Sequence, residues 1–389
     1  MVSFNNTEIA FKHKSDSDLK RANFLFKVMA KPGLVKVGKS LMNFGLKIHL
    51  PINGMIKATI FKQFCGGETI EQCTPTINAL WKNHVGTILD YSVEGKTSPE
   101  DFEATTKEII ATIAKAKGNP GIPFAVFKIT GISRFSILEK ANEDVAQLSE
   151  AGLKEYEEIV ERVNRICKAG FDSDVPVFID AEESWIQDTI DRISHEMMLK
   201  YNKERAIVYN TVQIYRHDRL SFIKDMIAWA KQEGLHYGVK LVRGAYMEKE
   251  RARAAAKGYP SPIQPDKNAC DADYDAALIF LLDNIDHMAL CAGTHNEKSS
   301  LFLVDLLKEK NIDPSDKRVY FAQLLGMSDH ISYNLAHAGY NVAKYVPYGP
   351  VKEVMPYMMR RADENTSVKG QTGRELSLIT QELKRRRIS

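Results

Sequence analysis

Eight short runs rich in β-branched and aromatic residues alternate with longer amphipathic stretches, and this alternation constrains the fold more than any other feature of the sequence. The runs are Val85 to Tyr91, Ile122 to Thr130, Val175 to Glu182, Ile207 to Tyr215, Gly238 to Tyr246, Met288 to His295, Arg318 to Gly326 and Asn341 to Gly349. Apolar residues three and four apart predict helices between them, at Ser98 to Ala116, Glu143 to Ala169, Ser184 to Tyr201, Leu220 to Gln232 and Ala272 to Asp286. Eight strands with crossover helices predict an α/β protein built as a (β/α)8 barrel. A doubly wound sheet of the Rossmann type would want a GxGxxG turn after its first strand, and the sequence contains none.

The remaining segments flank this barrel. Residues 1–80 predict a mainly helical arm, residues 81–369 the barrel, and residues 370–389 a C-terminal helix with a basic tail. We expect that tail, which ends in KRRRIS, to be frayed and solvated.

Composition and charge exclude several classes of protein. The net charge of the 389 residues is only +3, which argues against a dedicated nucleic-acid binder. Five scattered cysteines suggest neither a disulfide framework nor a metal site and favour a reducing compartment. No apolar stretch reaches the roughly 18 to 20 residues of a spanning helix, and the N-terminus lacks the apolar core of a signal peptide. We therefore expect a cytoplasmic protein.

The N-terminal segment is the exception to this balanced charge. Residues 1–65 hold eleven Lys and Arg against three Asp and Glu, a net charge of +8, which leaves −5 for the remainder. Apolar residues are interleaved with lysines from Phe24 and Phe26 through Leu34, Leu41, Phe44, Leu46 and Ile48. The pattern suits an interfacial helix that meets anionic lipid, and it equally suits a helix that packs on the barrel.

Polar residues stand at the ends of the apolar runs, where a barrel builds its active site. These are Asp90, Lys128, Asp180 with Glu182 and Glu183, Gln213 and Tyr215, Lys240, Arg243 and Thr294-His295-Asn296. Each alone could be a loop or helix-cap residue, but together they predict one polar mouth. An anionic ligand is expected, because Asp90 and Asp180 are outnumbered by the cations Lys128, Lys240, Arg243, Arg360 and Arg361, the last two on the helix after the last strand.

The motifs GVKLVRGAY, VFIDAEES, AGTHNE, FAQLLGMSD and KYVPYGPVKEVMPYMMRRADENTS together make the chain resemble the proline dehydrogenase family from about Leu89 to Val368. The resemblance implies a distorted (β/α)8 barrel that binds FAD and oxidises L-proline to 1-pyrroline-5-carboxylate by hydride transfer to flavin N5. It also implies a membrane quinone as electron acceptor and hand-over of the product to a separate pyrroline-5-carboxylate dehydrogenase. Fused bifunctional relatives exist, but 389 residues leave no room for a second catalytic domain, so a monofunctional enzyme is expected.

The same resemblance assigns residues to ligands. Arg360 and Arg361 would hold the proline carboxylate with Lys128 as a third cation, while Tyr345, Leu324 and Tyr246 would surround the ring. Asp180 and Lys240 match catalytic positions, where the carboxylate would orient and balance the cations. The positions that match flavin contacts are Ala181, Gln213, Arg243, Gly244, Ala245, Thr294, His295, Asn296 and Glu364.

One departure concerns the cations. Many bacterial members carry Arg where this chain has Lys240 and Lys where it has Arg243, so the resemblance implies the same charge with exchanged donors at the flavin. Positive charge near the substrate still suits the reaction, because it lowers the pKa of the proline ammonium, whose lone pair must be free before hydride leaves.

Three other readings stay open. Hydroxyproline oxidation uses the same chemistry, although the large Tyr345 favours proline. Lys128 at a strand end also suits a Schiff-base lyase, which would be colourless. The basic, Phe-rich arm could instead make the protein a membrane-association module with a degenerate barrel. The expected location is the bacterial cytoplasm, with peripheral contact to the inner membrane, and the alternative is the mitochondrion.

Overall fold

The computed structural model contains eight parallel strands that are hydrogen-bonded in chain order into a closed barrel. It describes residues 2–31, 33, 53–93, 97–367 and 371–388, without the side chains of 53, 55, 362–367, 371 and 372. The strands are β1 (Val85–Tyr91), β2 (Phe124–Phe127), β3 (Val177–Ile179), β4 (Val208–Gln213), β5 (Tyr237–Val242), β6 (Met288–Gly293), β7 (Val319–Leu324) and β8 (Val342–Tyr348). The predicted (β/α)8 barrel is confirmed.

All eight predicted strands are present, and most are shorter at their carboxyl ends than the sequence suggested. The run from Ile122 to Thr130, for example, is a strand only over Phe124–Phe127, and Lys128 begins the loop. The apolar character that marks a parallel strand buried on both faces continues past the last ladder hydrogen bond. The residues beyond that point are therefore loop residues at the strand ends.

The chain divides into two compact units, residues 1–94 with 323–389, and residues 95–322. This division follows packing rather than chain order, and the division into arm, barrel and tail made from the sequence stays a prediction.

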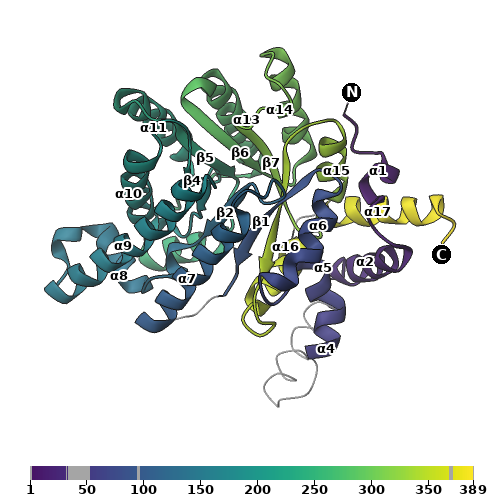
Figure 1. The fold of residues 1–389 in the computed structure, drawn as a ribbon, viewed down its shortest axis with the longest axis horizontal. Helices are drawn as coiled ribbons and strands as arrows, with labels where there is room; N and C mark the ends of the chain where they lie inside the picture. The colour runs from purple at the N-terminus through teal and green to yellow at the C-terminus, as the bar shows by residue number, and fades with distance from the viewer. Residues whose placement is uncertain (1, 32, 34–52, 94–96, 368–370, 389) are drawn as a thin grey trace. The chain divides into compact units, whose positions relative to one another are not determined.

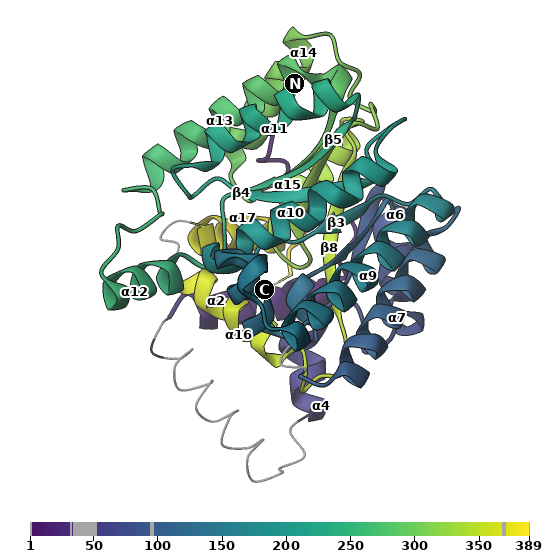
Figure 2. The ribbon, with the colours of Figure 1, turned by 90° about the vertical axis from the view of Figure 1, so that its left-hand side faces the viewer.

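The unit of residues 95–322 contains β2 to β6, most of β7 and the helices that connect them. These helices are α7 (Pro99–Ala116), α8 (Phe135–Glu143), α9 (Glu150–Ser173), α10 (Ser184–Tyr201), α11 (Arg219–Glu233), α12 (Met247–Lys257), α13 (Lys267–Asp283) and α14 (Glu297–Glu309), with short 3-10 turns η3 (Ile129–Gly131), η4 (Val145–Gln147) and η5 (Ile285–His287). Helices α7 and α9 pack side by side (Figure 2). The predicted α10 has the observed bounds, whereas α9 begins seven residues later than predicted, where Ser149 caps its first turn.

Aromatic rings fill the amino-terminal part of this unit's strands. Phe124 stacks on Phe178 with ring centroids 4.4 Å apart, and Tyr209 and Tyr320 meet Phe124 edge to face. The Lys240 ammonium lies 5.5 Å from the centre of the Phe178 ring. The apolar floor therefore ends where the charged side chains of the strand ends begin.

The other unit contains β1, β8 and the terminal segments. Its helices are α1 (Thr7–Phe11), α2 (Asp16–Met29), α4 (Asn53–Ile56), a π-helical turn η1 (Lys57–Phe61), α5 (Lys62–Phe64), a 3-10 turn η2 (Glu71–Cys73), α6 (Thr74–Trp81), α15 (Asp329–His337), α16 (Met355–Ser367) and α17 (Gln371–Arg385). Helices α2 and α17 pack against each other in this unit (Figure 1). They share an apolar cluster with α5 and α16 that includes Phe26, Phe64, Met358, Leu378 and Ile379.

This apolar cluster includes part of the basic N-terminal segment. Phe26 is 1% exposed within it, whereas Phe24 on the same helix is 61% exposed. Leu34, Leu41, Phe44, Leu46 and Ile48 lie outside the described residues. Among the helices that the structure describes, none is both long and apolar enough to cross a membrane.

The expectation of a frayed C-terminal tail is wrong for Arg385 and Arg386. Helix α17 continues to Arg385, and Arg386 donates hydrogen bonds to the Phe11 carbonyl at 2.7 Å and the Lys14 carbonyl at 2.8 Å. The buried Glu382 pairs with both arginines. The basic residues thus tie the last helix to the first two, a contact between chain ends that composition does not reveal.

Candidate active site

Three charged side chains meet at the carboxyl ends of β2, β3 and β5. Lys128 follows β2, Asp180 follows β3, and Lys240 lies within β5. The Lys128 ammonium donates to Asp180 Oδ2 at 3.1 Å, and the Lys240 ammonium donates to Asp180 Oδ1. One carboxylate therefore serves two ammonium groups. The Lys128 side chain is 27% exposed against 10% for Asp180 and 9% for Lys240, so Lys128 is the member that reaches the surface.

Glu182, which the sequence places at the same strand end as Asp180, is a buried neighbour of this cluster. Its carboxylate accepts hydrogen bonds from the backbone N–H of Thr130 at 3.1 Å and from the Thr130 hydroxyl. Burial raises the pKa of Glu182 to about 7, although the Thr130 donors and Lys128 act in the opposite direction. Glu182 joins the loops after β2 and β3 and so helps to place Lys128 and Asp180. The sequence indicates its place at the strand end, in the DAEES motif, but assigns it no role.

Gln213, at the end of β4, links the loop after β3 to the loop after β5. Its side-chain amide donates to the Glu182 carbonyl at 2.7 Å and accepts from the Ala245 N–H at 3.3 Å. Gly244 precedes Ala245 with φ +136°, and a Cβ there would overlap the ring of Tyr215. Glycine is required at this position, and both Gly244 and Ala245 are exposed residues.

Arg243 is held rigidly by side chains from three elements. It donates to Asp271 at 2.8 Å, to the Thr294 hydroxyl at 2.7 Å and to the Ser299 hydroxyl at 3.0 Å. Its guanidinium also lies 4.2 Å from the centre of the Tyr274 ring. A lysine has no planar fork for such a set of partners, so the exchange of Lys and Arg between positions 240 and 243 gives this chain a fixed guanidinium at the end of β5.

The motif Thr294-His295-Asn296 follows β6. The Asn296 side chain caps α14 by accepting from the N–H of Lys298 at 2.9 Å and of Ser299 at 3.4 Å. The Thr294 hydroxyl accepts from the Asn296 N–H at 3.1 Å as well as from Arg243. His295 between them is half-buried. The side chain of Asn296 thus performs the helix-cap role that the sequence left open.

Tyr246 stands at the start of α12, and a buried carboxylate fixes that start. Glu250 is fully buried and accepts from both the N–H and the hydroxyl of Ser184, each at 2.6 Å. The Glu250 N–H donates to the Tyr246 carbonyl at 2.9 Å. Burial raises the pKa of Tyr246 well above its ordinary value. The phenol is therefore a neutral group in this place.

Leu324, Tyr345, Arg360 and Arg361 belong to the other unit. The partly buried Leu324 ends β7, and Tyr345, which is 8% exposed, lies in β8. The next residue, Leu325, donates its N–H to the Tyr345 carbonyl at 2.9 Å, which joins the end of β7 to the middle of β8. Arg360 and Arg361 lie on α16, the helix after β8. Arg361 is buried with its guanidinium 4.9 Å from the centre of the Tyr357 ring, and Arg360 is half-buried. The side chain of Glu364, on the same helix, lies outside the described residues.

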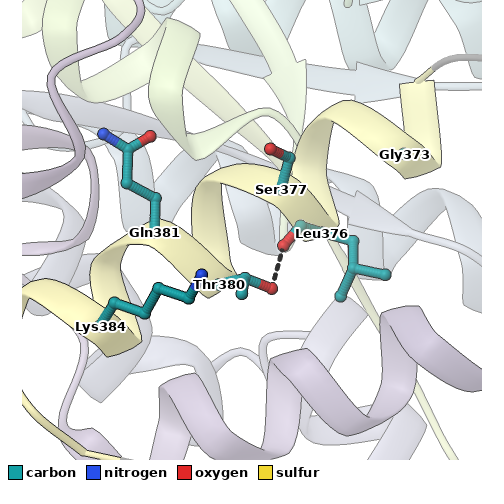
Figure 3. A pocket seen from close by; sticks show the side chains of 6 residues that line it. All are labelled: Gly373, Leu376, Ser377, Thr380, Gln381 and Lys384. Atoms are coloured by element: carbon teal, nitrogen blue, oxygen red, sulfur yellow. Dashed lines mark hydrogen bonds between the residues drawn. The ribbon is translucent and has the colours of Figure 1, made fainter.

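Two concave surfaces of the described structure are lined by other residues than the predicted site residues. One is a shallow groove along α17 lined by Gly373, Leu376, Ser377, Thr380, Gln381 and Lys384 (Figure 3). Within the described part of the chain, no group of three or more His, Cys, Asp or Glu residues is arranged to hold a metal ion.

Comparisons with known proteins agree on one family. The sequence model of a family described as proline dehydrogenase matches residues 73–374. The chain is 32% identical over 426 residues to "Proline dehydrogenase 1, mitochondrial" of Dictyostelium discoideum, and the match covers 98% of this chain and 74% of that protein. It is also 32% identical over 413 residues to "Hydroxyproline dehydrogenase" of Xenopus laevis, covering 97% and 88%. Several longer animal relatives are matched over less than half of their length.

A solved structure shares the fold at low sequence identity. Proline utilization A from Bdellovibrio bacteriovorus superimposes with a TM-score of 0.74 at 20% identity, over 95% of this chain and 40% of that one.

Proposed function

The chain belongs to the proline dehydrogenase family, and from that premise we propose that it oxidises L-proline to 1-pyrroline-5-carboxylate with bound FAD and passes the electrons to a membrane quinone. The observation that carries the proposal is the group of Lys128, Asp180 and Lys240, with two ammonium groups on one carboxylate. Such a group suits an anionic substrate whose ammonium must lose a proton.

The donors around β4, β5 and β6 fit a phosphate-bearing cofactor. Arg243 offers a fixed positive charge, and the exposed small residues Gly244 and Ala245 permit close approach of a ligand. We propose that FAD is held by these residues together with Ala181, Gln213, Thr294, His295, Asn296 and Glu364. When bound, FAD supplies the hydride acceptor for the reaction.

The chain's own residues would prepare the substrate. We propose that Arg360 and Arg361 bind the proline carboxylate and that Tyr345, Leu324 and Tyr246 pack on the ring. The positive charge of Lys128 and Lys240 lowers the pKa of the proline ammonium by like-charge repulsion, so the amine can lose its proton. Asp180 holds the two lysines in place and limits their repulsion, which is how it contributes to the reaction.

Absorbance spectroscopy tests this function directly. The purified protein should be yellow, and anaerobic addition of proline should bleach the flavin bands. A colourless protein, or a flavin that proline does not reduce, would contradict the proposal. The lyase alternative predicts no colour, and the pairing of Lys128 with Asp180 already disfavours it, since that pairing stabilises the ammonium form that cannot attack a carbonyl.

Substitution of the paired arginines tests substrate anchoring. Arg360→Met or Arg361→Met should each raise the proline KM steeply, because each loses a charge-assisted hydrogen bond worth roughly 1.5 to 3 kcal/mol. Flavin content should change little. Unchanged KM in both variants would remove these residues from the substrate site.

Hydroxyproline is the competing substrate, and the Xenopus relative bears that name. We favour proline because the large side chain of Tyr345 leaves less room for a ring hydroxyl. The variant Tyr345→Ser should therefore raise the ratio of kcat/KM for hydroxyproline over proline. If the ratio does not move, the choice between the two substrates loses its basis.

We propose that the basic N-terminal segment attaches the enzyme to a membrane surface where the quinone resides. The exposed Phe24 on α2 supports this, while the buried Phe26 belongs to the fold. Cosedimentation with anionic vesicles should be strong at low salt and weak at high salt. The names of the relatives support the mitochondrial alternative over the bacterial cytoplasm. We propose that the product then passes to a separate pyrroline-5-carboxylate dehydrogenase.

A further inference from the structure

The turn between β7 and α15 carries an unusual backbone. Gly326 has φ +76°, and Ser328, which is not glycine, has φ +51°. A Cβ at position 326 would overlap the backbone oxygen of Gln63. A non-glycine residue in the left-handed region persists only where its surroundings dictate it, and such residues gather at functional sites.

Three side chains from distant segments hold this turn by its backbone. The Gln63 amide of α5 donates to the Gly326 carbonyl at 2.8 Å. The Lys344 ammonium of β8 donates to the Leu324 carbonyl at 3.3 Å and to the Met327 carbonyl. The Glu375 carboxylate of α17 accepts from the Ser328 N–H at 2.9 Å. Four of the five residues from 324 to 328 are thus bonded by a side chain from outside the turn.

These three side chains are among the most buried polar groups of their unit. Lys344 is 0% exposed, Glu375 4% and Gln63 5%. Burying two ionisable groups costs several kcal/mol unless each is compensated. Asp329 compensates Lys344 with an ion pair of 2.9 Å. Burial raises the pKa of Glu375, which favours the neutral carboxyl and so lowers the cost of enclosing it. Hydrophobic residues would fill the same space at lower cost, so stability alone does not account for the set.

The turn joins two residues of the proposed proline pocket. Leu324 is its first residue and is bonded by Lys344, the neighbour of Tyr345 in β8. Leu325 donates to the Tyr345 carbonyl at 2.9 Å. A change in the conformation of the turn therefore moves Leu324 relative to the strand that carries Tyr345.

We propose that Gln63, Lys344 and Glu375 are positioning residues that fix the turn after β7 and thereby set the size of the substrate ring that the enzyme accepts. This inference rests on the proposed role of Leu324 and Tyr345 at the proline ring. The three residues touch no substrate in this account and act only through the turn.

The proposal is tested by the kinetics of Glu375→Leu and Gln63→Met, the two tether variants. Glu375→Leu and Gln63→Met each remove one bond to the turn, whereas Glu375→Gln keeps an acceptor oxygen for Ser328. We expect the first two to raise the KM for proline about tenfold with little change in kcat, and to raise the relative use of the six-membered ring analogue pipecolate, since one methylene is worth about 10- to 200-fold in a fitted pocket. Glu375→Gln should restore both values. If Glu375→Leu does not fold, the neutral change Gln63→Met decides alone.

Arg386→Met is the matched control. Arg386 also ties α17 to the N-terminal helices, through the carbonyls of Phe11 and Lys14, but it makes no bond to the turn. It should lower stability and leave KM and ring preference unchanged. An equal rise in KM for Arg386→Met, or unchanged KM and ring preference in both tether variants, would overturn the proposal.

Leu324→Ala separates this inference from the proposed function. If Leu324→Ala leaves KM and ring preference unchanged, Leu324 does not line the ring and the proposed pocket fails. If Leu324→Ala changes both while the tether variants change neither, only the positioning role fails.

Discussion

Asp180 and Asp329 each pair with two lysines, one aspartate in each of the two units. Asp180 pairs with Lys128 at 3.1 Å and with Lys240, while Asp329 pairs with Lys14 at 3.0 Å and Lys344 at 2.9 Å. The Asp180 cluster stands at strand ends with the Lys128 side chain 27% exposed. In the Asp329 cluster the Lys344 side chain is 0% exposed.

The surroundings give the two clusters different roles. The Lys344 ammonium donates to backbone carbonyls and pairs with Asp329, so its interactions stabilise the fold. Lys128 reaches the surface, where an anionic ligand can approach its charge. Identical residue types therefore serve structure in one unit and, in our proposal, substrate in the other.

The largest expected effect comes from removing each carboxylate in turn. Asp329→Asn should lower the free energy of unfolding by about 3 to 5 kcal/mol, because it leaves Lys344 buried without its counter-charge. Asp180→Asn should cost less stability, since Lys128 is 27% exposed and Lys240, at 9%, is less enclosed than Lys344 at 0%, but it should lower kcat/KM by about 100-fold or more. Denaturant unfolding and steady-state kinetics on both variants measure this. Equal loss of stability in the two would erase the distinction.

A pH titration of stability next tests Glu182, the buried neighbour of the Asp180 cluster. The pKa of Glu182 is raised to about 7 from its ordinary 4.5. Between these values the folded protein keeps a proton that the unfolded chain has lost, so this residue's contribution to stability is full below about pH 4.5 and is lost as pH rises through 7. The loss is roughly 1 to 3 kcal/mol in all. Unfolding free energies of wild type and Glu182→Gln should diverge toward pH 8, and parallel curves would contradict the buried neutral carboxyl.

The opposite pH dependence is expected beside the Asp329 cluster, with a smaller effect in the accessible range. Burial, reinforced by Lys14, lowers the pKa of His13 to about 3 from 6.5. The unfolded chain then takes up a proton below pH 6.5 that the folded protein refuses, so stability is present above 6.5 and declines as pH falls, by about 1 to 2 kcal/mol down to pH 5.

His13→Phe provides the comparison for this second titration. A phenyl ring can keep the stack on Tyr333, whose ring centre lies 3.8 Å from that of His13, but it cannot be protonated. Hydrogen exchange of residues 7–29, measured between about pH 5 and 7, should show protection that falls with acid in wild type and much less in the variant. The same decline in both would assign the acid sensitivity to another group.

The strand ends were predictable because their signals are local. An apolar run followed by Asp180 or Lys128 indicates where a parallel strand ends. Barrel geometry then places these residues at the same end of the strands. The grouping of Lys128 with Asp180 follows from that rule, whereas Lys240 lies within β5 and reaches Asp180 with its side chain. The family motifs added the expected roles, which the geometry by itself does not assign.

The sequence by itself determined the eight-stranded barrel and the charged character of its strand ends, since periodicity and strand boundaries are properties of neighbouring residues. Only the tertiary structure decided which charges are enclosed. Gln63 meets Gly326 across 263 positions, and Arg386 meets Phe11 across 375, which no local pattern encodes. A buried lysine such as Lys344 looks in the sequence like any lysine of an edge or a loop, because its burial depends on partners that distant segments supply, and those partners alone make its desolvation tolerable.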